Sequence, residues 1–498
     1  MIDFSQFQRQ SPKGILVNYG FVLSRIFRGS WVLLIILFTK QNLNYTYLFL
    51  GVMTVLIGAL ILAILQYVFY EFKIDNEHFI LKKGFIQKSN TSIPFERIQN
   101  VHFKQNIIQQ LIDVTQVEIE TAGSKGAEIS IKALPRNVAE ALKDALFAER
   151  NAEIANLESV DIQTHEEAKP LIKLSLTDLF KVSLTENHLT SLAIVASLFS
   201  SLISQLEEIL SSLKMKESWE SMFEENAQLL LGSALLIFGF IIILIIVSII
   251  VSIVKTFIIH YDLKVVLKNK AVEISQGLFT KQKFTLKKEK IQYITTATNP
   301  LKKLMGIFNV NFRQASSAQG RQQSKKQIRI VGATQEHIQS LQNLLYGLVD
   351  VSAHQKYYPH PYFRVLLMLR SSLFLLPLNG IIFLLELSTP WFLFNILFIP
   401  LILYLAKLKY DKSYYMIDNQ LVVKGFGRIE THQSIFEYHK LQGVSMSQNI
   451  FQIRRDVVNL NLLTASGNIK IPYVPKERAR LLYNHFLRHI EQSKKAWI

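Results

Sequence analysis

The sequence contains no cysteine among its 498 residues. This absence excludes disulfide bonds, thiolate metal sites and cysteine nucleophiles. The glycine-rich phosphate loop, the His-Glu-x-x-His zinc motif and the Gly-x-Ser-x-Gly nucleophile elbow are also missing from the sequence. We therefore expect neither an enzyme nor a cofactor, and no catalytic residue can be nominated.

Acidic residues are scarce relative to basic ones, with 38 Asp and Glu against 55 Lys and Arg, for a net charge of +17. Three explanations compete: nucleic-acid binding, anionic-lipid binding, and cytoplasmic loops that obey the positive-inside rule. The basic residues alternate with strand-forming apolar residues and no nucleic-acid motif occurs, so we expect no nucleic-acid partner. Hydrophobic residues make up 49% of the chain and are clustered, which favours the positive-inside explanation.

Long apolar runs come in pairs along the chain. The six runs are Phe21–Phe38, Tyr47–Tyr70, His188–Leu206, Leu229–Ile259, Leu366–Leu387 and Trp391–Leu405. Each is near the ~18–25 residues that a helix needs to cross the hydrocarbon core. The pattern predicts six transmembrane helices arranged as three hairpins.

Arginines stand near the start of the first and fifth runs, at Arg25, Arg28, Arg364 and Arg370. They are either functional charges inside the membrane or side chains that snorkel to the interface, and their place beside hydrophilic segments favours snorkelling. Pro377 and Pro400 are expected to kink their helices.

Two runs always separate consecutive hydrophilic regions, so parity places all three regions and the N-terminus on one side of the membrane. Their positive charge predicts the cytoplasmic side of the cell membrane. No cleavable signal peptide is recognised, and the first run is expected to stay as an anchor. The predicted divisions are 1–70 for the N-terminal segment and first hairpin, 71–150 for domain 1, 151–187 for a linker, 188–259 for hairpin 2, 260–350 for domain 2, 351–363 for a linker, 364–406 for hairpin 3 and 407–498 for domain 3.

One block recurs in all three hydrophilic regions without a gap. It occupies Arg97–Gly123, Lys290–Ser316 and Lys440–Ser466. A cation begins each block, and a glutamine and an asparagine follow at constant offsets. These signature residues are Arg97, Gln99 and Asn106; Lys290, Gln292 and Asn299; and Lys440, Gln442 and Asn449.

Alternating apolar residues and a glycine turn precede each block, and a further strand and a helical stretch follow it. We align the turn glycines as Gly84, Gly277 and Gly425, which leaves two extra residues in the third repeat. Several strands closed by a C-terminal helix suit a small bent or closed sheet.

Membrane hairpins that alternate with domains of this repeated pattern resemble bacterial membrane proteins with pleckstrin-homology-like (PH-like) domains, and the layout is similar to the YdbT-like family. The resemblance implies a seven-stranded antiparallel β-sandwich or barrel with a C-terminal helix for each domain. It also implies a partner, a smaller membrane protein with one domain of the same type, and a role in envelope integrity or in resistance to membrane-active compounds.

The basic clusters are the candidate lipid- or partner-facing residues. They comprise Lys82, Lys83, Lys88, Lys281, Lys283, Lys287, Lys288, Lys302, Lys303, Arg454 and Arg455. Beside a membrane they could contact anionic headgroups, and the alternative is a solvated surface that only reflects topology. We do not transfer phosphoinositide binding from other PH-like folds, because no basic loop recurs identically in the three repeats.

Two histidines, His354 and His360, are near enough in sequence to suggest a metal site, but a linker at the membrane interface fits their spacing better. We expect a non-enzymatic scaffold whose tethered domains bind one another, a partner protein or the lipid surface, and self-association of the chain is the alternative to the smaller partner. The alternative is a transporter or lipid-handling protein, which needs polar residues inside the spans such as Gln66, Arg370 and Asn379.

Overall fold

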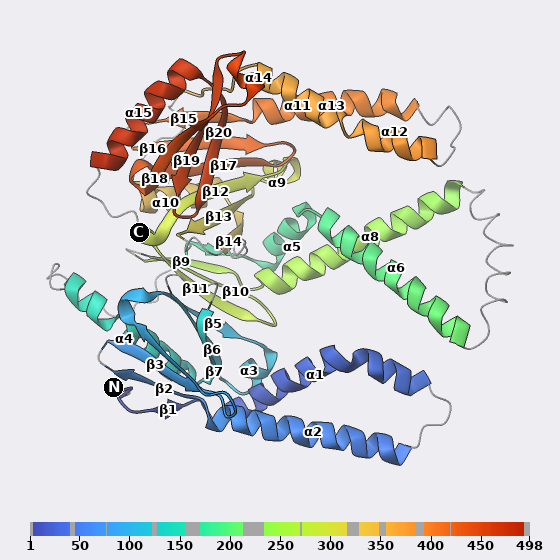
Figure 1. Ribbon diagram of the computed structural model, residues 1–498, viewed down its shortest axis with the longest axis vertical. Helices are drawn as coiled ribbons and strands as arrows, with labels where there is room; N and C mark the ends of the chain where they lie inside the picture. Colours follow the sequence, from blue (N-terminus) through green and yellow to red (C-terminus); the bar gives the residue numbers. More distant parts are fainter. Residues whose placement is uncertain are drawn as a thin grey trace.

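The structure is a computed structural model of the whole chain. The described residues are 3–39, 45–75, 77–121, 127–155, 170–212, 234–268, 271–315, 328–347, 355–384, 393–418 and 420–492. Three sheet domains form a row, and paired helices extend from each domain toward the same side (Figure 1). The acidic segment 207–228, the basic loop 317–326 and His354 lie wholly or largely outside the described residues.

The three domains share one order of elements. Domain 1 contains β2 (Glu71–Asp75), β3 (His78–Lys83), β4 (Ser89–Pro94), β5 (Ile98–Gln105), β6 (Thr115–Thr121), β7 (Ala127–Leu134) and helix α4 (Arg136–Ala155). Domain 2 contains β9 (Lys264–Lys268), β10 (Ala271–Gln276), β11 (Lys281–Lys287), β12 (Ile291–Thr298), β13 (Phe308–Gln314), β14 (Ile328–Ala333) and α10 (Gln335–Tyr346). Domain 3 contains β15 (Tyr414–Ile417), β16 (Leu421–Gly427), β17 (Thr431–Glu437), β18 (Leu441–Ser447), β19 (Val457–Thr464), β20 (Gly467–Pro475) and α15 (Lys476–Gln492).

Each domain has six main strands among its described residues, and domains 1 and 2 each have one further short strand, which makes the seven that we expected. A short segment that precedes each membrane hairpin pairs with the first strand that follows the hairpin. This segment is β1 (Gln8–Arg9) on β2, β8 (Ile172–Lys173) on β9, and a single bridge from Tyr357 to Tyr415 in β15. Each structural repeat therefore begins before its hairpin, and the hairpin is inserted between two paired segments.

The turn glycine of the third repeat is Gly427, and our alignment of Gly425 was wrong. Gly84, Gly277 and Gly427 all have positive φ, and at each one a Cβ would lie within 2.1 Å of the carbonyl oxygen three residues later. Only glycine adopts this turn without strain. Gly425 instead lies inside β16 against the ring of Tyr414. With Gly427 in place, all three repeats have equal spacing from glycine to cation.

The signature asparagines are helix N-caps in all three domains. Each begins a short helix, which is α3 (Ile107–Leu111), α9 (Pro300–Leu304) or α14 (Ile450–Ile453). The side chain of each asparagine accepts a hydrogen bond from the backbone N–H three residues later, at 2.7–2.9 Å. An N-cap of this kind is typically worth about 1 kcal/mol. The repeated asparagine is thus explained by local structure.

Neighbouring domains share their sheets. Strand β5 of domain 1 pairs with β11 of domain 2, which makes a seven-stranded sheet, and β12 of domain 2 pairs with β17 of domain 3, which makes a six-stranded sheet. The register is the same in both, because the pair Gln105–Lys281 corresponds to the pair Thr298–Thr431 in the repeat alignment. We name these contacts junction 1 and junction 2.

The hydrophobic core also crosses junction 2. One cluster of buried side chains combines domain 2 residues such as Ile294 and Leu341 with Met416, Val423 and Ile435 of domain 3. Domain 1 has a core of its own around Phe72 and Phe79. Burial of this extent at junction 2 resembles the interior of a single domain, so domains 2 and 3 are held as one unit.

The helices that extend from the domains are α1 (Gly14–Thr39), α2 (Tyr45–Val68), α6 (Leu189–Ser212), α8 (Ala234–His260), α11 (Tyr362–Ser372), α12 (Leu375–Leu384) and α13 (Phe394–Asp411). Among the described residues, two helical segments are long and apolar enough to cross a membrane, Thr46–Val68 and Phe238–His260. A third candidate is the pair α5 (Leu176–Thr185) and α6, which is bent by 75°.

The fifth apolar run forms two helices rather than one. Helix α11 ends at Ser372 and α12 begins at Leu375, and the break directly follows the polar residues Arg370, Ser371 and Ser372. Pro377 follows this break by a few residues. It lacks the N–H that would bond to the carbonyl of Leu373, and its ring crowds that carbonyl. We expected Pro377 to kink its helix, and the structure has a break between two helices beside it instead.

A buried ion-pair cluster attaches the second hairpin to domain 2. Glu186 caps α5, directly before α6, and its Oε1 accepts hydrogen bonds from Lys302 Nζ at 2.7 Å and from Arg329 Nη2 at 2.8 Å. Asn299 Nδ2 donates to the carbonyl of Thr185 at 2.6 Å. Lys302 is only 2% exposed, so its charge depends on this carboxylate.

Replacing Glu186→Gln is expected to destabilise domain 2 by about 3–5 kcal/mol, because it leaves the buried Lys302 ammonium without a carboxylate. Denaturant unfolding of the full chain in detergent measures the change. The double variant Glu186→Gln with Lys302→Met should recover most of the loss, since it removes the unpaired cation. A single variant as stable as the parent would contradict the role of the cluster.

Candidate functional site

Side chains reinforce junction 1 beside the shared strands. Asn100 Nδ2 of domain 1 donates to Gln314 Oε1 of domain 2 at 3.3 Å, and Gln110 Nε2 in α3 donates to the carbonyl of Phe279 at 3.1 Å. The ring centroids of His102 and Phe284 lie 5.4 Å apart, edge to face. This junction thus combines backbone pairing with polar and aromatic contacts.

Junction 2 uses the same strand positions with other side chains. Thr295 Oγ1 and Ser434 Oγ share a buried hydrogen bond of 2.8 Å, at the positions that His102 and Phe284 occupy in junction 1. The C-terminal helix of domain 2 also contacts domain 3, because Tyr346 Oη donates to the carbonyl of Ile435 at 2.7 Å. Each junction therefore holds two domains in a defined orientation.

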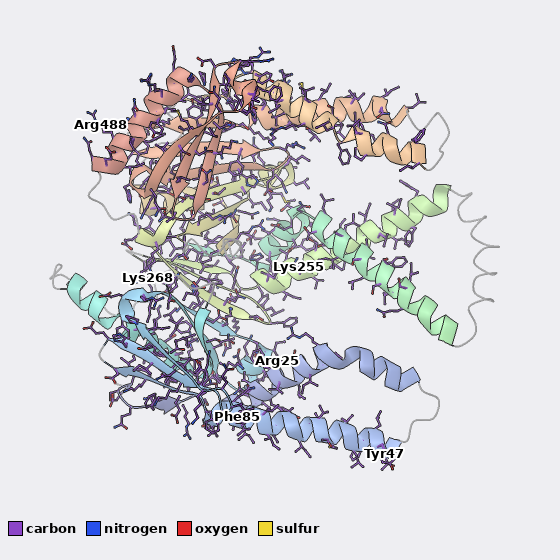
Figure 2. All side chains as sticks on the ribbon, viewed as in Figure 1. Arg25, Tyr47, Phe85, Lys255, Lys268 and Arg488 are labelled. Carbon is purple, nitrogen blue, oxygen red and sulfur yellow. The ribbon has the colours of Figure 1, made fainter. Side chains whose placement is uncertain are left out.

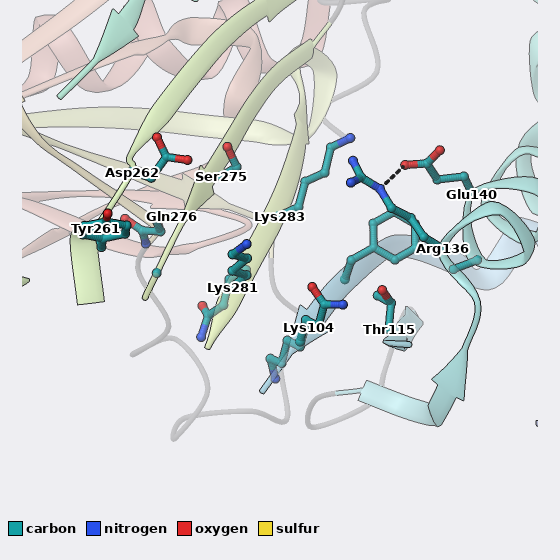
Figure 3. A pocket seen from close by; sticks show the side chains of 15 residues that line it. Lys104, Thr115, Arg136, Glu140, Tyr261, Asp262, Ser275, Gln276, Lys281 and Lys283 are labelled. Carbon is teal, nitrogen blue, oxygen red and sulfur yellow. Dashed lines mark hydrogen bonds and ion pairs between the residues drawn. The ribbon is translucent and has the colours of Figure 1, made fainter. Parts of the chain in front are cut away.

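A cavity of about 180 Å³ opens at junction 1. It lies between the start of α4 and the turn and strand ends of domain 2 (Figure 3). Charged side chains dominate its labelled lining: Lys104, Arg136, Glu140, Asp262, Lys281 and Lys283. Arg136 Nε donates to Glu140 Oε1 at 3.4 Å across the helix surface. The cavity is basic on balance and could hold a small anion.

Glu273 organises the lysines beside this cavity. Its carboxylate lies 3.0 Å from Lys268 Nζ, 3.8 Å from Lys283 Nζ and 4.0 Å from Lys143 Nζ of α4. Burial raises the pKa of Glu273, but Lys283 and Lys268 outweigh burial and hold the pKa below its usual value. Glu273 therefore remains a carboxylate at neutral pH and connects domain 2 to α4 of domain 1.

The glycine turns expose apolar side chains at their tips. Ile86 is 84% exposed, and Phe279 and Ile429 occupy the matching positions in the other repeats at 47% and 58%. The first turn lies near the base of α2, since the rings of Phe69 and Phe85 are 6.3 Å apart. We name these three tips, together with the short helices, the apolar rim.

The short helices continue this rim. Each exposes large apolar residues: Ile107, Ile108 and Leu111 in α3; Leu301, Leu304 and the following Met305 at α9; and Ile450, Phe451 and Ile453 in α14. All three helices lie at the end of their domain from which the long helices extend (Figure 1). An exposed apolar surface repeated three times, with cations nearby, is typical of a lipid-facing surface.

The predicted basic residues occupy several different environments. Lys82, Lys83, Lys88, Lys281, Lys303, Arg454 and Arg455 are exposed, while Lys283, Lys287 and Lys288 are half-buried. The Arg455 guanidinium lies 4.9 Å from the ring centroid of Tyr362, at the base of the third hairpin. We expected Lys302 to face lipid or a partner. That prediction was wrong, because Lys302 is buried against Glu186.

The cations and glutamines of the signature differ between repeats according to their neighbours. Lys440 Nζ of domain 3 donates to the carbonyl of Glu289 in domain 2, whereas Arg97 of domain 1 is exposed. Gln292 is 1% exposed but Gln442 is exposed. The side chain of Gln99 lies outside the described part of the chain.

The remaining candidates have local roles. His360 Nδ1 accepts a hydrogen bond from the backbone N–H of Tyr362 at the start of α11. Within the described residues, no three His, Asp or Glu side chains gather as metal ligands would. Sequence reasoning missed Glu186 and Arg329, because nothing in either local pattern signals an ion pair between distant segments.

Lys424 is a second residue that sequence reasoning missed. It lines a cavity of about 150 Å³ in domain 3, together with Tyr414 and Lys470. Burial, reinforced by the charge of Lys470, lowers the pKa of Lys424 to about 8. The unfolded chain keeps the ordinary value near 10.4, so it binds more protons than the folded chain between these two pH values. Stability should therefore rise with pH across this interval.

Replacing Lys424→Met is expected to stabilise the full chain at pH 7, by at most about 3 kcal/mol, because the folded state no longer holds a buried cation. The advantage over the parent should shrink as the pH rises toward 10. Unfolding of both proteins in detergent at the two pH values measures it, with exposed Lys303→Met as the control. An advantage that does not change with pH would contradict the assignment.

One known domain family recurs along this chain. The bacterial PH domain model matches this chain three times, at residues 32–150, 226–349 and 372–490. Each match includes one sheet domain and part of the hairpin that precedes it. The matches together cover well over half of the chain.

A curated relative is also similar. The UPF0699 transmembrane protein YdbT of Bacillus subtilis (strain 168) is 24% identical to this chain over 288 residues. The alignment covers 55% of this chain and 56% of the relative, so the chain spans little more than half of the relative's length. The resemblance to YdbT-like membrane proteins with PH-like domains, inferred from the repeated blocks, is confirmed. With three matches to one model and the same strand order in each, this chain belongs to the bacterial PH domain family.

Proposed function

We propose that this membrane protein is a non-enzymatic scaffold, whose three PH-like domains form a rigid platform on the membrane surface. The observation that carries the proposal is the continuity of the sheets across both junctions. Independent tethered domains would be expected to reorient, whereas domains joined by backbone hydrogen bonds present one fixed surface.

The proposed topology has six spans in three hairpins, with the domains and the N-terminus on the cytoplasmic side of the cell membrane. Cationic residues lie at the domain ends of the helices, as Arg25 and Lys255 do in Figure 2, while Tyr47 lies at the far end of α2. Positive charge on one side and an interfacial tyrosine on the other are typical of helices that cross a membrane.

The rim supports contact with the lipid surface. Apolar tips would enter the headgroup region, and exposed cations such as Lys88, Lys303 and Arg454 would meet anionic headgroups, at on the order of 1 kcal/mol per cation. Anionic lipid is therefore the proposed ligand of the rim, with the platform held flat against the bilayer.

The proposed protein partner is a smaller membrane protein that carries a single PH-like domain, and the proposed role is envelope integrity or resistance to membrane-active compounds. The alternative is a transporter or lipid-handling protein, which needs polar groups along a pathway. Asn379 and Asn395 in the third hairpin bond to each other at 2.7 and 3.1 Å, which suits a contact between helices. We therefore favour the scaffold.

A spin label tests the rim. The chain has no cysteine, so Ile429→Cys gives a single labelling site at a turn tip. In vesicles with anionic lipid, this label should collide more with oxygen, which partitions into lipid, than with a water-soluble nickel chelate. Leu481→Cys on α15, which is 72% exposed and away from the long helices, is the control and should show the opposite preference (Figure 1). Equal behaviour of both labels would contradict lipid contact.

Affinity purification from native membranes tests the scaffold. Tagged full-length chain, solubilised in mild detergent, should retain a stoichiometric membrane protein that mass spectrometry identifies as carrying a PH-like domain. Recovery of the chain alone and monomeric would overturn the proposed partner. An unrelated six-span protein carrying the same tag is the control for nonspecific recovery.

A further inference from the structure

Two edges of the kind that forms the junctions lack a partner, one in domain 1 and one in domain 3. Within the described residues, β18 pairs only with β19, and β4 pairs only with β3. In the repeat, β18 corresponds to β5 and β12, while β4 corresponds to β11 and β17. At junction 1 the equivalent of β18, which is β5, pairs with the equivalent of β4, which is β11. At junction 2 the corresponding strands are β12 and β17. The chain thus carries both halves of a third junction.

Exposure at β18 differs from its counterparts position by position. Gln442, Ser445, Met446 and Ser447 are exposed. The matching residues of β12, which are Gln292, Thr295, Thr296 and Ala297, are between 1% and 8% exposed. Since the strands share their place in the domain, the difference arises from the neighbouring domain that covers β12.

Edge strands are usually protected against pairing by charge, proline or a bulge that turns them away. Strand β18 has the sequence LQGVSMS, with neither charge nor proline. Its bulge between Leu441 and Gly443 recurs at the same position in β5 and β12, which nevertheless pair across the junctions. Strand β4 has the sequence SNTSIP, and its single proline lies beyond the positions that pair in the two junctions. Both edges are therefore open to strand addition.

We propose that this chain assembles head to tail with a second copy of itself, through a third junction between β18 of one copy and β4 of the next. The inference goes beyond the proposed scaffold, because it identifies a self-association surface. It depends on the proposed topology in one respect, because domains 1 and 3 must lie on the same side of the membrane.

The shared register of junctions 1 and 2 specifies the third one. It places Ser445 opposite Thr91, Met446 opposite Asn90 and Ser447 opposite Ser89. The first pair reproduces the chemistry of Thr295 and Ser434, whose hydroxyls bond at 2.8 Å in junction 2. The polar strand β4 matches the polar exposed edge of β18, and this match favours a second copy as the occupant.

Such an interface is heterologous, because each copy uses one surface to bind and a different surface to be bound. Heterologous contacts close into rings or extend as open rows, according to the rotation between copies. In a membrane, the row of domains already present in one chain would continue into the next copy.

Disulfide trapping of differently tagged copies tests the junction, since the chain has no native cysteine. One copy carries Ser445→Cys, the other carries Thr91→Cys, and both are reconstituted together as full chains without other proteins. Mild oxidation should give the mixed dimer as the main product, since directly opposed strand residues lie within disulfide reach. The matched control replaces Thr91→Cys by the neighbouring Ser92→Cys, whose side chain points to the other face and should give only a trace.

Charge variants provide a second readout that does not need oxidation. Ser445→Lys in a chain with native β4 should lose self-association in light scattering, and adding Thr91→Asp to the same chain should restore it. A monomer in every case, or equal trapping by Thr91→Cys and Ser92→Cys, would overturn the third junction. Trapping of Ser445→Cys in native membranes by another protein alone would overturn the second copy as occupant. The partner of the scaffold could still be recovered in all of these cases, so the two proposals fail separately.

Discussion

The need of edge strands for hydrogen-bond partners governs this structure. Each PH-like domain folds into two short sheets, and each sheet has an edge that would otherwise present unpaired N–H and C=O groups. The chain satisfies four of these edges internally by pairing β5 with β11 and β12 with β17. Three small domains thereby become one row, and the orientation of every hairpin relative to its neighbours follows from that row.

The membrane adds a second constraint on the same domains. A pair of helices leaves each domain at one end, so in the proposed topology the turns and short helices at that end lie close to the bilayer. Water-facing turns would carry polar tips, yet Ile86, Phe279 and Ile429 are apolar and exposed. The cluster around Glu186 connects α5, which leads into the second helix pair, to domain 2.

Much of the fold could be predicted because its signals are local. Apolar runs identify the long helices, alternation identifies the strands, and the ungapped repeat shows that the three domains share one fold. The asparagine that recurs at Asn106, Asn299 and Asn449 is explained by an N-cap that depends on only three following residues. The error at Gly425 has a local cause too, since two glycines lie close together and only backbone conformation separates Gly427 from its neighbour.

The candidate site was harder to predict, because its members come from distant parts of the chain. In the sequence, Lys302 cannot be distinguished from a surface lysine. Only the fold places Glu186, at the end of α5, against it. Lys424 looks like a strand lysine, and only packing around it lowers its pKa to about 8. Equivalent residues also differ in exposure. Gln292 is buried and Gln442 is exposed, because a neighbouring domain covers β12 and none covers β18.

By itself, the sequence determined the membrane character, the threefold repeat and the local structure of each domain, since hydropathy, periodicity and capping act over a few residues. Tertiary structure alone decided which strands of different domains pair, which cations are buried, and which edges stay open. Backbone hydrogen bonds between strands carry no side-chain code, so their choice of partner depends on the placement of whole domains.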